Sequence, residues 1–242
     1  DLDNLRILER NVEYDDIENK IKKMKTRGLN NINLDLMYAL PNEKLSTLKK
    51  DITRILKLEP THISTYSLII EEHTKMNNDN IKNIDEELDF KMYNLICNKL
   101  KKSGFNHYEV SNFALPGYES KHNLNYWNNG EYYGFGLGAS GYKDGFRYTN
   151  TRNIHEYIEG NYRLEENLMT HKEQMDNELM LGFRKLQGIN VLDFFNKYNT
   201  NIQDVYPVQE LIDKGELIYK NGYLYINPNM IYVMNEILLK LI

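Results

Sequence analysis

The hydrophobic positions in the first 115 residues recur alternately with helical and strand periods. Apolar residues at helical spacing predict helices over 16–27, 43–58 and 87–103. Runs rich in β-branched and aromatic residues predict strands over 31–38, 62–70 and 107–114. Helix followed by strand, three times over, predicts an α/β fold with parallel strands and right-handed crossovers. Three units are too few to close an eight-stranded barrel, so either the sheet is open or its other strands lie outside this sequence.

The pattern changes near residue 168. Helical periods are followed by a hairpin, whose turn is Asn221-Gly222, and by a final helical stretch over 229–242. This order is typical of a winged-helix-like α+β module. Residues 168–242 carry 7 Lys and Arg against 9 Asp and Glu, a net charge of −2. A DNA-binding module normally presents a basic face, so packing or docking is favoured over DNA binding.

Composition narrows the class of protein. The net charge of −5 gives no overall attraction to nucleic acid or anionic membranes. No apolar run approaches the roughly 18 residues that span a bilayer. The one cysteine, Cys97, excludes an internal disulfide framework and favours a reducing, cytoplasmic location. The chain starts at Asp1 without an initiator methionine, which favours a piece of a longer protein.

The stretch HNLNYWNNGEYYGFGLGASGY, residues 122–142, contains a possible nucleotide-binding pattern. Gly136, Gly138 and Gly141 fit the spacing G-x-G-x-x-G. In a dinucleotide-binding fold this pattern follows a buried strand and opens a helix, whose N-terminus holds the pyrophosphate. Here polar residues precede the pattern, and a turn and a strand are expected after it. The nucleotide hypothesis therefore fails, and the glycines indicate tight turns or close approach of the backbone.

Four motifs, in this order and spacing, are similar to one family. They are NLDLMYALP (33–41), YEVSNFA (108–114), HNLNYW (122–127) and GFGLGA (134–139). The family is the radical S-adenosylmethionine (SAM) group of oxygen-independent coproporphyrinogen III oxidase and the related bacterial heme chaperone. The resemblance implies the second half of a (β/α) barrel in residues 1–165 and a winged-helix-like domain in residues 166–242. The HNLNYW motif resembles the heme-chaperone branch.

The chain departs from the family at its most characteristic motif. The family binds a 4Fe-4S cluster through a C-x-x-x-C-x-x-C loop and holds SAM with a Gly-Gly-Thr-Pro segment and a glutamate. None of these is in the sequence, and Cys97 lies on a predicted helix instead. The chain thus resembles the C-terminal two-thirds of the family and is expected to lack cysteine ligands for the cluster, so it cannot perform radical chemistry alone.

Three residues match SAM-contacting positions of the family. Arg10 would grip a carboxylate or ribose, although a solvated arginine is the simpler interpretation and Glu9 replaces the usual glycine. Asp35 interrupts an apolar strand, where an unpaired buried carboxylate is costly; the alternative is an outward-facing residue. Ile69 matches a position whose backbone contacts the adenine side, and its side chain adds no support.

The resemblance places heme at the HNLNYW motif. His122 is the candidate axial ligand of the heme iron, and otherwise it makes a structural hydrogen bond. Asn123 is expected to hold its neighbours by side-chain hydrogen bonds. Tyr126 and Trp127 would stack on the macrocycle, or belong to the core as most aromatic residues do.

We therefore interpret the chain as part of a heme-chaperone-like radical SAM protein that binds heme and passes it to a hemoprotein, with SAM and a 4Fe-4S cluster in the intact protein. Two other classes stay open: an oxygen-independent coproporphyrinogen III oxidase, and a simple interaction module. The expected partners are heme or porphyrin and a recipient hemoprotein, through which the protein could reach a membrane surface, and not nucleic acid. The open apolar edge of half a barrel also predicts a homodimer or poor solubility.

Overall fold

The computed structural model describes residues 5, 8 and 13–242, so Arg10 lies outside the described residues. The chain divides into two compact units, Asp1–Glu119 and Ser120–Ile242, and each is described by itself. The domain boundary expected between residues 165 and 166 falls within the second unit and stays a prediction.

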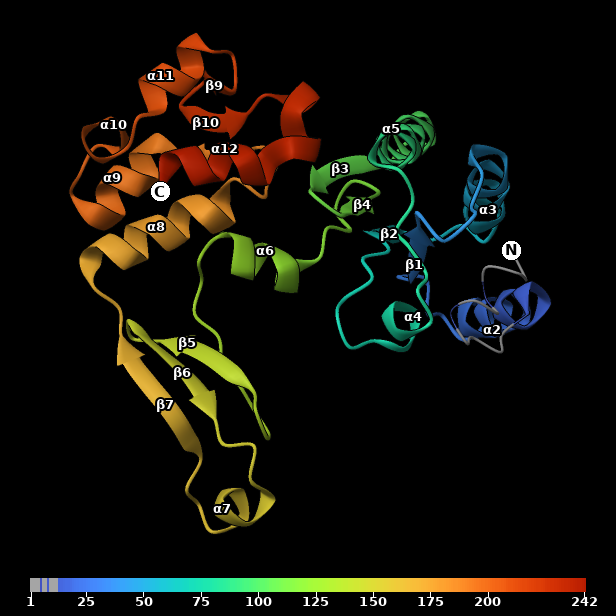
Figure 1. The fold of residues 1–242 in the computed structure, drawn as a ribbon, viewed down its shortest axis with the longest axis horizontal. Helices are drawn as coiled ribbons and strands as arrows, with labels where there is room; N and C mark the ends of the chain where they lie inside the picture. The colour runs from blue at the N-terminus through green and yellow to red at the C-terminus, as the bar shows by residue number, and fades with distance from the viewer. Residues whose placement is uncertain (1–4, 6–7, 9–12) are drawn as a thin grey trace. The chain divides into compact units, whose positions relative to one another are not determined.

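The first unit has the mixed α/β architecture that the alternating periods predict (Figure 1). Its helices are α2 (Tyr14–Thr26), α3 (Leu45–Lys57), α4 (Lys75–Asn78) and α5 (Glu86–Lys102). Its strands are β1 (Asn33–Tyr38), β2 (His62–Ser67), β3 (Asn106–Glu109) and β4 (Asn112–Ala114), which form sheet A in the order β1-β2-β4-β3. β1 and β2 are parallel neighbours, and α3 connects them, as expected for a β-α-β unit.

The prediction of one parallel strand over 107–114 is wrong. The segment folds back on itself as the hairpin β3–β4, with a register shift between His107 and Glu109. β4 then inserts antiparallel to β2, while β3 again runs in the direction of β2. Val110 and Ser111 connect the two strands, and the Ser111 carbonyl accepts hydrogen bonds from the backbone and side chain of Thr65 at 2.7 and 3.0 Å. The sheet is therefore mixed.

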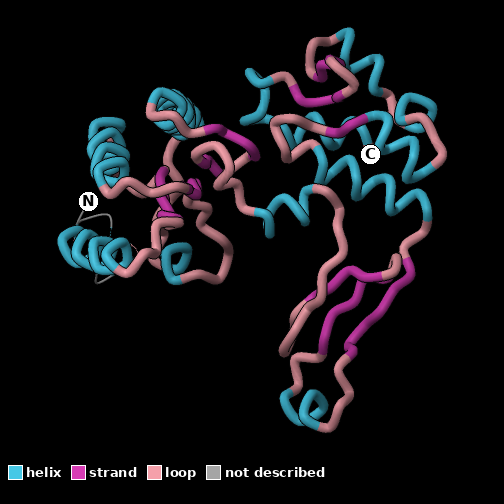
Figure 2. Tube along the Cα trace, turned by 180° about the vertical axis from the view of Figure 1, so that it is seen from behind, coloured by secondary structure: helices cyan, strands magenta, loops and turns pink. Residues whose placement is uncertain are grey.

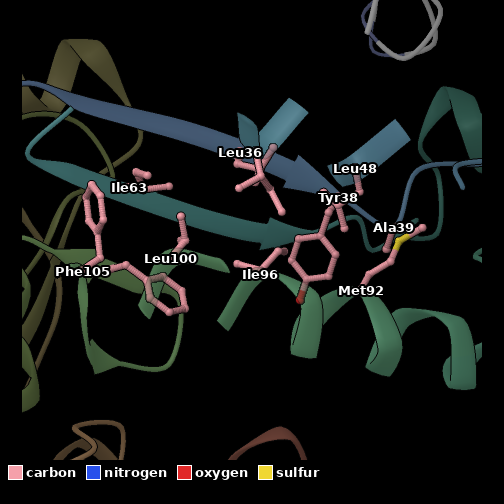
Figure 3. Packing of buried hydrophobic residues seen from close by; sticks show 11 residues of the cluster. Leu36, Tyr38, Ala39, Leu48, Ile63, Met92, Ile96, Leu100 and Phe105 are labelled. Atoms are coloured by element: carbon pink, nitrogen blue, oxygen red, sulfur yellow. The ribbon is translucent and has the colours of Figure 1, made fainter. Parts of the chain in front are cut away.

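One face of sheet A packs against α3 and α5 (Figure 3). Leu36 and Tyr38 of β1 and Ile63 of β2 lie against apolar side chains of both helices, because alternate strand residues point to the same face. The helices contribute Leu48, Ile52, Met92, Ile96 and Leu100, all essentially inaccessible to solvent. A second, smaller cluster consists of Ile21, Ile32 and Leu58, and it packs α2 against the start of β1 and the end of α3.

The second unit opens with a short helix and sheet B. The helix α6 (Lys121–Trp127) precedes the antiparallel strands β5 (Ser140–Lys143), β6 (Phe146–Asn150) and β7 (Arg163–Leu168), and α7 (Ile154–Ile158) lies between β6 and β7. Figure 2 shows the three strands of sheet B side by side, with α7 in the connection at one end. The sequence pattern gave no sign of β7 because every one of its residues is exposed.

The C-terminal part of this unit follows the predicted order. Its elements are α8 (His171–Gly182), β8 (Ile189–Asn190), α9 (Val191–Tyr198), α10 (Ile202–Val205), α11 (Val208–Asp213), β9 (Leu217–Lys220), β10 (Tyr223–Ile226), the 3₁₀ helix η1 (Pro228–Val233) and α12 (Met234–Leu241). The β9–β10 hairpin is confirmed, and Asn221 and Gly222 at its turn have φ angles of 53° and 81°. The expected final helix begins instead as η1. None of the described helices is both long and apolar enough to cross a bilayer.

Two isoleucines close in sequence test the assignment of core and surface in the first unit. Ile63 is fully buried in β2, whereas Ile69 lies beyond that strand and is 68% exposed. We expect Ile63→Ala to lower the free energy of unfolding by about 2–5 kcal/mol, because it leaves a cavity in the core. Ile69→Ala should change it by less than about 0.5 kcal/mol. Urea unfolding of both variants measures the difference, and equal losses would contradict this packing.

Candidate functional site

The face of sheet A opposite α3 and α5 carries a chain of hydrogen bonds that ends at Asp35. The hydroxyl oxygen of Tyr108 lies 2.7 Å from Nε2 of His62, and Nδ1 of His62 lies 2.7 Å from Oδ1 of Asn33. Asn33 in turn donates from Nδ2 to Oδ1 of Asp35 at 2.8 Å. Since an amide oxygen only accepts, Nδ1 of His62 must be the protonated nitrogen. Burial lowers the pKa of His62 and so favours the neutral ring, although the charges of Asp35 and Glu119 act in the opposite direction.

Asp35 also lines a cavity of about 510 Å³ beside β1. The walls are mostly apolar, and the other charged side chains are those of Asp51 and Arg54. The Asp35 side chain is exposed. Its exposure agrees with the alternative interpretation, that of an outward-facing carboxylate. Its Oδ2 makes no hydrogen bond to any described residue, which leaves that oxygen available to a ligand.

The loop after β1 holds an unusual backbone around a buried carboxylate. Ala39 is 1% exposed and has a φ of 61°, a left-handed conformation that is costly for a residue with a side chain. Glu43, 4% exposed, accepts a hydrogen bond from the backbone N–H of Leu40 at 3.1 Å. Burial is the main cause that raises the pKa of Glu43 to about 7; the hydrogen bond from Leu40 opposes this rise, and the nearby Asp51 adds to it. Because Leu40 lines the cavity, Glu43 supports one of its walls.

The other residue predicted to contact SAM in the described part of the chain lies outside the strand. Ile69 follows the end of β2 by two residues, and its side chain is 68% exposed. The backbone N–H of Ile70 donates to Oδ1 of Asn83 at 3.1 Å, which ties this loop to the segment before α5. Ile69 does not line the cavity beside Asp35, and its predicted role stays a prediction.

The HNLNYW motif forms α6 in the second unit. The hydroxyl of Ser120 accepts from the backbone N–H of Asn123 at 3.3 Å and begins the helix. At its C-terminal end the side chain of Asn129 donates to the Gln174 carbonyl and to Glu178, both at 3.4 Å, on α8. The helix is therefore fixed at one end by its cap and at the other by α8.

His122 lies exposed on the first turn of α6. Its ring meets that of Tyr126 edge-on, with centroids 4.8 Å apart. Neither ring nitrogen has a hydrogen-bond partner among the described residues. The structural hydrogen bond considered for His122 is thus not formed within the described part of the chain, and its nitrogens are free to bind a metal centre.

The other three residues of the motif are placed differently. Asn123 makes its capping bond through the backbone, and its side chain has no described hydrogen bond. Tyr126 is half-buried between the rings of His122 and Tyr132, the latter at 4.5 Å. Trp127 is also half-buried, with the Arg184 guanidinium 5.5 Å from its ring, and its buried Nε1 has no described partner. Tyr126 and Trp127 therefore form part of the packing around α6.

The glycine-rich stretch is a tight loop rather than a nucleotide-binding loop. The backbone N–H groups of Gly134 and Gly136 donate at 3.0 Å to the hydroxyls of Tyr148 and Tyr157, and their carbonyls both accept from Nδ2 of Asn150. A Cβ at Gly134 would lie 2.4 Å from the Ser140 carbonyl oxygen, so the close packing requires glycine. The stretch continues into β5, which agrees with the rejection of the dinucleotide pattern.

The described residues offer no ligand set for an iron-sulfur cluster. Among them, no three His, Cys, Asp or Glu side chains gather closely enough to hold a metal ion. Cys97, the one cysteine, lies half-buried on α5, and burial raises the pKa of its thiol to about 11. A thiol that holds its proton so firmly is a poor metal ligand. The described residues therefore do not fit an iron-sulfur cluster.

Comparisons with known proteins define the class of this chain. The profile of the HemN C-terminal domain matches residues 169–232. The structure of coproporphyrinogen III oxidase (HemN) from Escherichia coli, described as a radical SAM enzyme, matches with a TM-score of 0.80 at 13% identity, over 98% of this chain and 60% of that one. The family resemblance predicted from the motifs is confirmed, and the chain corresponds to the C-terminal part of that family.

Several sequence relatives carry the name heme chaperone HemW. HemW of Lactococcus lactis is 41% identical over 217 residues, which make up 86% of this chain and 56% of that protein. HemW of Bacillus subtilis is 34% identical over 233 residues, or 92% of this chain and 62% of the relative. HemW of Escherichia coli is 32% identical over 215 residues, or 83% and 57%. The chain thus spans somewhat more than half the length of these relatives.

Motif resemblance and metal-ligand spacing do not reveal the network behind Asp35, but the period of polar residues on two strands does. Asn33 and Asp35 occupy alternate positions of β1, and His62 and Ser64 occupy alternate positions of β2. Polar residues at every second position of an otherwise apolar strand point to one face. That period was the available signal for a polar site on sheet A.

Glu43 makes the stability of the first unit depend on pH. Its pKa rises from an ordinary 4.5 to about 7 on folding, so between these values the folded chain binds more protons than the unfolded chain. We expect this group to reduce stability as the pH rises from about 4.5 to 7, by on the order of 2–3 kcal/mol in total. Glu43→Gln should remove that decline. Denaturant unfolding at pH 5 and pH 8 measures it, and an unchanged pH dependence in the variant would contradict the assignment.

Proposed function

We propose that the intact protein is a heme chaperone and that this chain supplies its heme contact through α6. Heme is then the cargo, to be bound and passed to a recipient hemoprotein. The observation that carries the proposal is the exposed imidazole of His122, whose nitrogens have no partner among the described residues. The relatives named heme chaperone support the same function.

The residues of α6 have separate roles in this proposal. His122 binds the heme iron through a neutral ring nitrogen. Tyr126 orients the imidazole by its edge contact at 4.8 Å. Trp127 and the bonds from Asn129 keep the helix against α8. Asn123, whose side chain is only partly buried, lies beside His122 and can donate to a ligand.

SAM binding belongs to the first unit in the intact protein. Asp35 would accept hydrogen bonds from SAM with its free oxygen, while the bond from Asn33 holds the carboxylate in place. Arg10 and Ile69 are proposed to act with it, as the family resemblance implies. SAM, when bound with a cluster in this family, supplies a radical. The cluster ligands would come from the N-terminal part that the relatives possess.

The finer architecture follows from the same family. We infer that sheet A forms the second half of a (β/α) barrel, whose other strands would continue beyond β1. We infer also that residues 166–242 form a winged-helix-like domain, supported by the helices and the three-stranded sheet β8-β10-β9. The single cysteine supports a reducing, cytoplasmic setting, where a recipient hemoprotein would be met.

Oxygen-independent coproporphyrinogen III oxidase is the second candidate. The similarity of fold to HemN, with a TM-score of 0.80, favours it. Anaerobic turnover of coproporphyrinogen by the intact protein, supplied with cluster and SAM, would establish this activity and replace the chaperone proposal. We expect no turnover, since the relatives that match in sequence are named heme chaperones.

Heme titration of the 242-residue chain tests the proposed role of His122. We expect a saturable shift of the Soret absorbance with near-equimolar heme. His122→Ala should weaken binding by about tenfold or more, because a ligand to the iron is lost.

The matched control is His155→Ala, which removes another exposed imidazole from the same unit. It should bind heme as the unaltered chain does. Non-saturable binding, or an equal affinity in the chain and in His122→Ala, would refute the role of α6.

A further inference from the structure

A second cavity, of about 600 Å³, lies against one face of sheet B. The strand register places Tyr132, Tyr142 and Arg147 on the same face, together with Asn167 of β7. Ser140, Thr149 and Glu165 form the next row of that face. Most of these side chains carry polar groups, and they converge from three strands. The cavity therefore resembles a polar binding site more than a gap in a core.

Among the described residues that line this cavity, Arg147 is the one cation. Its Nε is buried and has no hydrogen-bond partner, and the guanidinium forms no ion pair with any described residue. The centroid of the Tyr142 ring lies 5.6 Å from the guanidinium carbon. A buried donor without an acceptor is costly, and more so on a charged group. An incoming anion would relieve that cost.

The acidic residues of the cavity do not neutralise Arg147. Both backbone and hydroxyl of Thr170 donate to Glu173 at 2.7 Å, so that carboxylate is occupied in capping α8. Glu165 lies on the neighbouring strand, one row from Arg147, and is exposed. It forms no ion pair with Arg147, but its charge must oppose the binding of an anion. Its removal therefore offers a test with the opposite sign.

Aromatic contacts connect this cavity to the proposed heme contact. Tyr132, which lines the cavity, meets Tyr126 at 4.5 Å between ring centroids. Tyr126 meets His122 at 4.8 Å. A ligand bound at α6 is thus separated from the cavity by one pair of aromatic rings. A ligand that carries carboxylates on flexible arms could place one of them in the cavity.

We propose that Arg147 binds a carboxylate of the ligand held by His122, which for heme is a propionate. The inference rests on the proposed function and adds the group that recognises the acidic side of the macrocycle. A planar guanidinium matches a carboxylate with two parallel hydrogen bonds. The hydroxyls of Ser140 and Thr149 share a hydrogen bond of 3.2 Å, which leaves one of them to donate to a ligand on the same face.

Two ligands that differ only in charge test this inference. Heme and its dimethyl ester share the iron and the ring, but the ester has no carboxylate. We expect Arg147→Met to weaken heme binding about tenfold or more, with little change for the ester. Arg147→Lys should retain part of the affinity because it keeps the charge. Glu165→Gln should tighten heme binding by a few fold.

The control is Arg152→Met, which removes an exposed arginine of the same unit and changes the net charge equally. It should leave both affinities unchanged. Thermal unfolding, monitored by circular dichroism, shows whether each variant is folded. If Arg147→Met is unfolded, Arg147→Lys is compared with the unaltered chain instead.

The possible results separate the two proposals. If His122→Ala weakens heme binding but Arg147→Met does not, the inference about Arg147 is wrong and the heme proposal stands. Equal losses for heme and its ester in Arg147→Met would also overturn it, since the effect would then be structural. An unaltered chain without saturable heme binding would overturn both.

Discussion

The alternation of side chains along a β-strand is the constraint on which both units depend. In sheet A it sends Leu36 and Tyr38 into the helical layer and presents Asn33 and Asp35 on the opposite face. Burial of the first face fixes the register, because a slip of β1 by one residue would place Asn33 and the carboxylate of Asp35 in the core. The geometry of the polar face is thus a consequence of apolar packing on the other.

The same alternation sets the two faces of sheet B. Tyr148 crosses Gly141 on one face, where an added Cβ would lie 2.1 Å from its ring. Arg147, the preceding residue, must then face the other way, toward the cavity. Tyr148 and Asn150 of β6 also hold the glycine-rich loop through hydrogen bonds to the backbone of Gly134. Structural residues on one face therefore position the charged residue on the other.

Part of the candidate site could be predicted from particular residues. Asp35 is a candidate because an unpaired carboxylate in an apolar strand is energetically costly. The HNLNYW motif is a candidate because it resembles a motif of a known family. The hydrogen bonds of His62 and the unpaired state of Arg147 could not be predicted in this way. Their partners are distant in sequence, as with His62 and Tyr108, or absent from the described residues, as with Arg147. Burial and pairing are properties of the folded chain.

The sequence by itself determined the order of the main helices and strands, the turn at Asn221-Gly222 and the family. Hydrophobic periods and turn residues act locally, so they are visible without a fold. Only the tertiary structure decided that residues 106–114 form a hairpin, that β4 enters antiparallel beside β2, and that β7 is a strand. The pairing of β4 with β2 joins segments that are distant in the chain, whereas the hairpin and β7 pair with neighbouring segments that carry no distinct apolar pattern. An exposed edge strand such as β7 needs no apolar pattern, because its neighbour supplies the pairing.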